Sequence, residues 1–134
     1  MKVYSEILRF STRGEMDIVD FTEKALAVLR RSGVSNGLLH LYTPHTTGII
    51  AINENDASLL RDIRRTLERL VPKKDPYEHP ENAHSHVRSL LLSHEQTVPV
   101  VDGKASLGTW QSMLFIEADT SARQRSVVVQ IIGE

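Results

Sequence analysis

Three of the six histidines in this chain lie within one eight-residue stretch, from His79 through His84 to His86. Imidazole is a common ligand for zinc and similar metals, and it gains and loses a proton near neutral pH. A cluster of histidines therefore suggests metal binding or proton transfer. The alternative is a solvated polar loop, because an isolated histidine in a loop is usually just exposed.

Two other groups of polar residues lie at the boundaries of expected strands. One combines residues 43–47 with residues 53–55, and the other consists of residues 108–111. The site of a single domain is normally assembled from several loop ends. A shared site therefore requires these groups to converge with residues 79–86.

The absence of cysteine restricts any transition-metal site to histidine, aspartate, glutamate or water. His45, His79 and His86 would offer three neutral nitrogens and leave one coordination position open, as in catalytic metal sites. His84 and His86 would share a face of an extended chain. In a helix they would diverge, and only one of them would serve as a ligand.

Several side chains are suited to phosphate or proton chemistry. Thr46, Thr47, Arg123 and Arg125 can hydrogen-bond phosphate oxygens. The alternatives are that the threonines serve strand packing and that the arginines are paired surface charges. Glu54 is a candidate general base, or a partner that orients a histidine, and its alternative role is simply to begin a helix.

Composition limits the class of protein. A length of 134 residues suits one domain that buries roughly two-thirds of its unfolded surface. A net charge of -1 gives no overall attraction to nucleic acid or to an anionic membrane. No apolar run approaches membrane-spanning length, and early charges at Lys2 and Glu6 argue against a signal peptide. We therefore expect a cytoplasmic protein that binds neither nucleic acid nor membrane.

Hydrophobic periodicity predicts an α+β fold: a single domain, residues 1–134, with a mainly antiparallel, sandwich-like β-sheet and two or three inserted helices. Asp102-Gly103 suits a hairpin turn, and Pro99 indicates an edge strand or a bulge. Strands are expected at residues 2–11, 16–19, 37–43, 47–53, 98–101, from 105 onward, 110–117 and 126–132, and helices at 21–32, from 55 or 56 up to Pro72, and 87–93.

From about residue 35 to the C-terminus, the order of several short motifs resembles the YjbQ family. The motifs are Thr43-Pro44-His45-Thr46-Thr47, Ile52-Asn53-Glu54-Asn55, Tyr77-x-His79, Ser85-His86-Val87-Arg88, Val98-Pro99-Val100, Gly108-Thr109-Trp110-Gln111 and Arg123-x-Arg125.

The resemblance implies a β-rich α+β fold, a homotrimer, and a polar pocket near the subunit interface with a divalent metal. Zinc is the first expectation, with magnesium as the alternative if the substrate is a pyrophosphate. The family's histidines fall on His45, His79 and His86, its acidic residue on Glu54, its Trp and Gln on Trp110 and Gln111, and its arginines on Arg123 and Arg125.

This chain departs from the family pattern at four positions. Gly48 stands where Ala is usual, Arg88 where Lys is commoner, and Glu95 where Ser is typical. His84 is an extra histidine, which leaves the choice between His84 and His86 open, although the following Val87-Arg88 favours His86.

For function, the resemblance implies secondary thiamine-phosphate synthase activity, in which a phosphorylated small molecule is condensed with release of pyrophosphate. A second hypothesis is a trimer that sequesters a metabolite or metal without turnover, and a third is a structural trimer stabilised by metal. We favour the enzyme, because Glu54 and an open three-histidine site would be unnecessary for sequestration.

Overall fold

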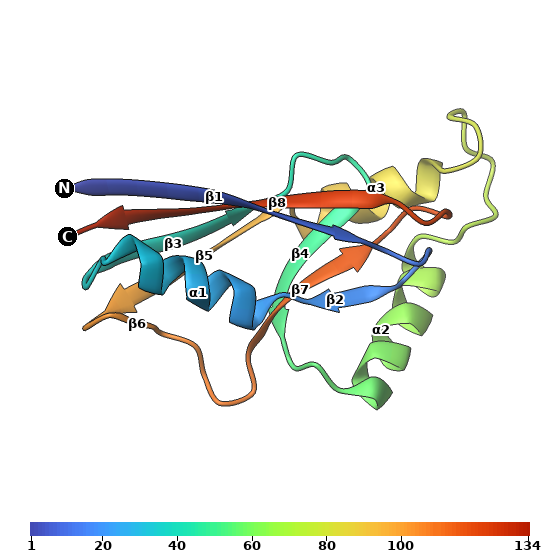
Figure 1. Cartoon of the computed structure of the whole chain (residues 1–134). Coiled ribbons are helices and arrows are strands. Elements are labelled where there is room, and N and C mark those ends of the chain that lie inside the picture. The colour runs from blue at the N-terminus through green and yellow to red at the C-terminus, as the bar shows by residue number, and fades with distance from the viewer.

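The computed structural model describes residues 1–134, which form eight strands and three helices. Both chain termini lie at one end of the molecule, and α3 lies toward the other (Figure 1). None of the helices combines the length and the apolar character needed to cross a bilayer. The elements are β1 (Lys2–Ser11), β2 (Ile18–Asp20), α1 (Thr22–Ser32), β3 (Gly37–Tyr42), β4 (Gly48–Asn53), α2 (Ala57–Leu70), α3 (Ala83–Leu92), β5 (Glu95–Val101), β6 (Lys104–Ala105), β7 (Ser112–Glu117) and β8 (Gln124–Gly133).

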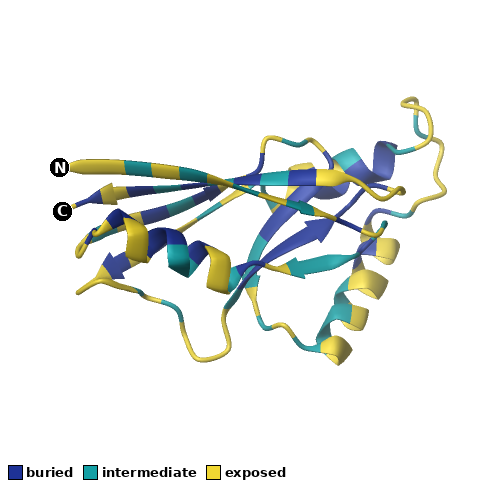
Figure 2. Cartoon of the chain, in the orientation of Figure 1, coloured by how far each residue is buried: buried dark blue, intermediate teal, exposed yellow.

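The larger sheet has five antiparallel strands in the order β1-β8-β3-β5-β6. Side chains of β8 alternate between its two faces, and those that point inward include the apolar Val127, Val129 and Ile131. The inner face of the sheet is therefore apolar. Figure 2 shows this alternation of buried and less buried positions along the strand. Ala25 and Val28 of α1 pack in the same core, so the helix covers this face of the sheet.

The smaller sheet has three antiparallel strands in the order β2-β7-β4. Its central strand, β7, is buried from Met113 through Glu117. A second, smaller core joins this sheet to α2 through Ile49, Leu67 and Ile116. Strands β4 and β7 therefore form an extended pair, with Gly48 and Glu117 buried at one end and Asn53 exposed at the other.

Close packing calls for a small residue at Gly48, the position at which the family resemblance led us to expect Ala. A Cβ at this position would lie 2.5 Å from Cζ of Phe115, whose side chain is fully buried. The ring therefore occupies the space of the missing methyl group, and the small residue lets β4 approach β7 closely.

The structure confirms the expected α+β class, the antiparallel sheets and the number of helices. The expected start of α3 at Val87 was wrong, because the helix begins at Ala83. The buried face of this helix is polar and includes His84, Ser85 and Arg88, so apolar periodicity did not reveal its first turn. Trp110 precedes β7 instead of beginning it.

Two further strands are longer than predicted, since β5 begins at Glu95 and β8 at Gln124. The edge position expected for Pro99 is confirmed, because β6 pairs only with Val100 and Val101. The proline therefore lies where β5 has β3 as its sole partner.

Candidate functional site

The predicted site residues divide between the two ends of the β4–β7 pair. In this pair Gly48 lies opposite Glu117, and Asn53 lies opposite Ser112. The six residues of β4, at about 3.3 Å each, separate the two ends by roughly 20 Å. We call the Gly48 and Glu117 end the histidine end (His45, Thr46, Thr47, His79, His86, Arg123, Arg125). The Asn53 and Ser112 end is called the tryptophan end (Glu54, Trp110, Gln111).

The histidine end is built on a buried ion pair between Arg125 and Glu117. Arg125 Nε donates to Glu117 Oε1 at 2.7 Å, and Nη2 makes a second bond to the other carboxylate oxygen. Nη2 also donates to the backbone oxygen of Thr47 at 3.1 Å and to its hydroxyl at 2.8 Å. Thr12 donates to Glu117 at 2.6 Å.

This arrangement corrects two sequence expectations. Arg125 and Thr47 are buried and directed toward protein partners, so within this chain neither presents a free group to a phosphate. The sequence also gave no role to Glu117, the anchor of the pair. The sequence held one indication of this role: Glu117 is a charged residue at the end of an apolar strand, β7. A charge buried in such a strand needs a partner of opposite charge.

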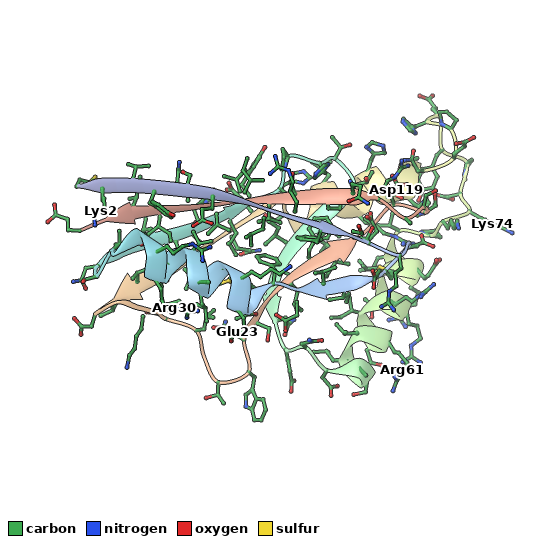
Figure 3. All side chains as sticks on the ribbon, in the orientation of Figure 1. Lys2, Glu23, Arg30, Arg61, Lys74 and Asp119 are labelled. Carbon is green, nitrogen blue, oxygen red and sulfur yellow. The ribbon has the colours of Figure 1, made fainter.

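Asp119 connects this ion pair to α3 (Figure 3). Its carboxylate accepts from the Thr120 N–H at 2.8 Å, from Asn82 and Thr47 at 3.3 Å each, and from Arg123 at 3.2 Å. Burial by itself would raise the pKa of Asp119, but these hydrogen bonds and the charge of Arg123 hold it below its usual value. Because Asn82 precedes the first residue of α3, this hydrogen bond attaches the start of the helix to the carboxylate.

Arg123 is the arginine that this end presents to solvent, with 47% of its side chain exposed. Its Nη2 lies 3.0 Å from Asp119, and its backbone N–H donates to the Thr12 hydroxyl at 3.1 Å. Thr46 is also exposed. Arg123 and Thr46 therefore remain candidates for phosphate binding, whereas Arg125 and Thr47 do not.

His45 is half-buried beside the first residues of β8. Its Nε2 accepts from the Ser126 N–H at 3.1 Å, so a neutral ring carries its proton on Nδ1. Burial is the main cause that lowers the pKa of His45; the charge of Arg125 lowers it further, and Glu117 acts in the opposite direction. In this conformation neither ring nitrogen has a lone pair free for a metal.

His79 and His86 form a pair of rings with centroids 4.8 Å apart and planes tilted by 54°. Two histidines bound to one tetrahedral zinc at about 2 Å per bond would have ring centroids about 5 Å apart. The centroid separation of the pair is therefore compatible with two of four ligand positions. The expected convergence with His45 was wrong within one chain, because no group of three or more histidine, aspartate or glutamate side chains is placed to hold a metal ion.

His84 is a core residue, which leaves His86 as the candidate ligand that lies beside His79. It is fully buried, and its Nε2 lies 2.9 Å from Glu15. Arg88 reaches the same carboxylate at 3.4 Å and donates to the Val71 carbonyl at 2.8 Å. As expected for positions two apart in a helix, His84 and His86 point to different surroundings.

Glu54, Trp110 and Gln111 lie together at the tryptophan end. With Ile52 and Asn53 they line a hollow of about 250 Å³. The expected position of Glu54 beside the Thr46-Thr47 edge was wrong, because β4 extends the chain between them. Glu54 therefore orients no histidine within one chain, and Trp110 and Gln111 have no cationic neighbour with which to bind a phosphate there.

The largest hollow, about 630 Å³, belongs to neither end and lies between residues 13–18 and α2. It is a wide, open depression, and its Arg13 and Asp17 are already paired at 2.8 Å. None of the motifs singled out from the sequence lines it. The two ends of β4 remain the candidates, because they hold the residues of those motifs.

Comparison with known proteins gives one consistent result. The family described as UPF0047 protein YjbQ-like matches residues 6–134. A UPF0047 protein from Methanothermobacter thermautotrophicus is 42% identical over 137 residues, covering 100% of this chain and 95% of that protein. The UPF0047 protein YugU from Bacillus subtilis is 33% identical, covering 94% of this chain and 97% of that protein.

Solved structures agree in fold over nearly the whole chain. A YbjQ-like protein from Sulfolobus solfataricus has a TM-score of 0.96 at 31% identity, with 99% of each chain covered. A yjbq/upf0047 family protein from Clostridium acetobutylicum has a TM-score of 0.90 at 36% identity, covering 95% of this chain and 99% of that one.

We predict that the two arginines of the closing motif differ sharply in their effect on stability. Arg125→Ala leaves Glu117 buried without a partner and should lower the free energy of unfolding by about 3–5 kcal/mol. Arg123→Ala removes a half-exposed ion pair and should cost less than about 1 kcal/mol. Urea denaturation of both variants measures the difference, and equal losses would contradict the assigned roles.

We also predict a pH effect at His45. Its folded-state pKa is lowered, so the neutral ring contributes stability that is present above the unfolded value of about 6.5 and is lost as the pH falls through the folded pKa. Titration followed by NMR should show the ring gaining its proton below pH 6.5. The loss of stability between neutral and acidic pH should shrink in His45→Gln, and a ring that titrates above 6.5 would refute the prediction.

Proposed function

The chain belongs to the YjbQ-like UPF0047 family, and from that premise we propose that it is a homotrimeric, metal-assisted enzyme acting on a phosphorylated small molecule. The observation that carries the proposal is the His79–His86 pair, which Asn82 and Asp119 link to the half-exposed Arg123. Imidazole pairs and a guanidinium beside them suit an anionic substrate.

The proposed reaction is the one that the family resemblance implies. A thiazole-phosphate nitrogen attacks the methylene carbon of a pyrimidine methyl pyrophosphate and forms a C–N bond. The C–O bond to pyrophosphate breaks, and its electron pair leaves with the pyrophosphate. Negative charge grows on that leaving group, so Arg123 and Thr46 would stabilise the transition state by donating hydrogen bonds to it.

A divalent metal would supply further positive charge to the leaving group when bound. Zinc is favoured by histidine ligands and magnesium by a pyrophosphate substrate. His79 and His86 would hold two positions in this chain, and the remaining ligands would come from substrate, water or another subunit. His45 would join them only after losing its bond to Ser126.

Exposed apolar side chains support the homotrimer. No helix of the chain covers the outer face of the five-stranded sheet, where Ile7, Leu38 and Tyr42 are 42–49% exposed. On α3, Leu90 and Leu91 are 76% and 66% exposed. Contiguous apolar surface of this kind usually marks a protein contact. A trimer would also allow the histidine end of one chain to meet the tryptophan end of another.

The alternative is a trimer that binds a phosphorylated metabolite or a metal without turnover. Two observations favour it: one chain holds no complete set of metal ligands, and Glu54 is remote from the histidines. The enzyme remains our proposal. If the histidine end of one subunit meets the tryptophan end of another, the second subunit could complete the metal ligands and bring Glu54 to the histidines.

We predict a solution mass near 45 kDa, three times the chain mass of 15.1 kDa. Leu38→Glu places a charge among the exposed apolar residues of the sheet, and Leu90→Glu does so on α3. If either surface forms the subunit contact, the matching variant buries an unpaired charge, so at least one of the two should reduce the mass to that of a single chain. Light scattering gives the answer, with Glu23→Lys on the solvent face of α1 as the control. A wild-type mass near 15 kDa would refute the trimer.

We predict slow formation of thiamine phosphate that depends on the histidine pair. Chelation and His86→Ala should each lower the rate and the bound metal by about 10- to 100-fold. Glu54→Gln should lower the rate while leaving the metal bound. His84→Ala is the matched control, since it should reduce stability but keep the metal. Unchanged turnover in His86→Ala and Glu54→Gln would favour the binding alternative.

Mixed oligomers extend this test. If the two ends meet between subunits, His86→Ala chains combined with Glu54→Gln chains should regain part of the activity that each variant lacks alone. Absence of any recovery, in oligomers shown to be mixed, would mean that the two ends do not form a shared site between subunits.

A further inference from the structure

Trp110 is the single tryptophan of the chain, and it is 73% exposed. It lies in a turn closed at both sides, because Gly108 N–H donates to the Gln111 side chain at 2.8 Å and Gln111 N–H donates to the Gly108 carbonyl at 3.1 Å. The turn lies in the loop between β6 and β7 (Figure 1). A large apolar ring is therefore held in solvent by fixed backbone geometry.

The carboxylate of Glu54 shares the hollow with this ring and has no charged partner. Glu54 takes part in none of the ion pairs of the chain. The hollow of about 250 Å³ has Asn53 and Gln111 as its other polar residues and Ile52 as its apolar floor. This volume is slightly below the usual range for drug-sized ligands and suits a small head group.

A second hollow of about 310 Å³ continues the first, since Ile52 and Gln111 line both. Neither hollow is lined by a lysine or an arginine, so Glu54 is the sole charged residue of the groove. An anion here would meet a carboxylate and no compensating cation. A cation would meet both the carboxylate and the negative face of an indole ring.

We propose that the groove at the tryptophan end binds an organic cation with a compact ammonium head, which lies against Trp110 and is neutralised by Glu54. Quaternary and alkyl ammonium groups are recognised by aromatic faces in this way. The side chains of Asn53 and Gln111 would hydrogen-bond the polar tail of such a ligand. Within one chain the groove is separate from the phosphate-binding candidates, because the histidine end lies roughly 20 Å away along β4.

Three probes test the charge requirement directly. Choline carries the quaternary ammonium, 3,3-dimethylbutan-1-ol is its neutral carbon isostere, and inorganic pyrophosphate is the anion. The indole N–H signal of Trp110 in NMR is unique in this chain, so it reports binding at this groove alone. Choline should shift it saturably, and the neutral isostere should bind at least about tenfold more weakly. In Arg123→Ala, which removes the exposed guanidinium of a neighbouring histidine end, pyrophosphate should leave the signal unchanged.

Variants then separate the two contacts. Glu54→Gln and Trp110→Leu should each weaken choline binding about five- to tenfold, with the second variant followed by the signals of Gln111. Glu78→Gln removes an exposed carboxylate outside the groove and is the matched control. Thermal unfolding by circular dichroism verifies that all three variants are folded, as expected for side chains outside the core.

Three outcomes would overturn the proposal. Equal affinity for choline and its neutral isostere would mean that the groove recognises shape and not charge. A saturable shift with pyrophosphate in Arg123→Ala would make it an anion site. Choline binding that survives Glu54→Gln and Trp110→Leu unchanged would place the contact elsewhere. None of these results depends on turnover, so failure here is distinct from failure of the proposed enzyme.

Discussion

The buried pair of Arg125 and Glu117 is the interaction on which the histidine end depends. It joins β8 to β7, and its remaining hydrogen bonds hold the Thr47 backbone before β4 and Thr12 after β1. Neither ion is tolerable in the core without the other, since an unpaired buried charge costs several kcal/mol. Four segments that are distant in sequence are thus fixed together by one requirement of charge neutralisation.

The same network decides which side chains are available for binding. Glu117 also accepts from the Asp119 N–H at 2.9 Å, and Asp119 in turn fixes Asn82 at the start of α3 and so the position of His86. Side chains in the ion pair are not free to bind a ligand, because they are buried and already bond within the protein, as Arg125 does. Groups one or two residues further out, such as Arg123, remain half-exposed on a backbone that the pair has made rigid.

Sequence patterns predicted those parts of the fold whose buried faces are apolar. The alternation in β8 is read directly because Val127, Val129 and Ile131 supply its inner face. The first turn of α3 was missed because its buried face consists of His84, Ser85 and Arg88. Glu15 and the Val71 carbonyl satisfy those polar groups, and a pattern that counts apolar residues cannot detect partners so distant in sequence.

The sequence supplied candidate site residues but not their arrangement in space. Thr47 and Glu54 are close in sequence, yet an extended strand carries them to opposite ends of the fold, where they face different charges. A guanidinium is exposed at one end, and an unpaired carboxylate at the other. A ligand with both a phosphate and a cationic ring is therefore complementary to the two ends together. One chain holds those ends too far apart for a small molecule, so such a ligand would be bound where two subunits meet.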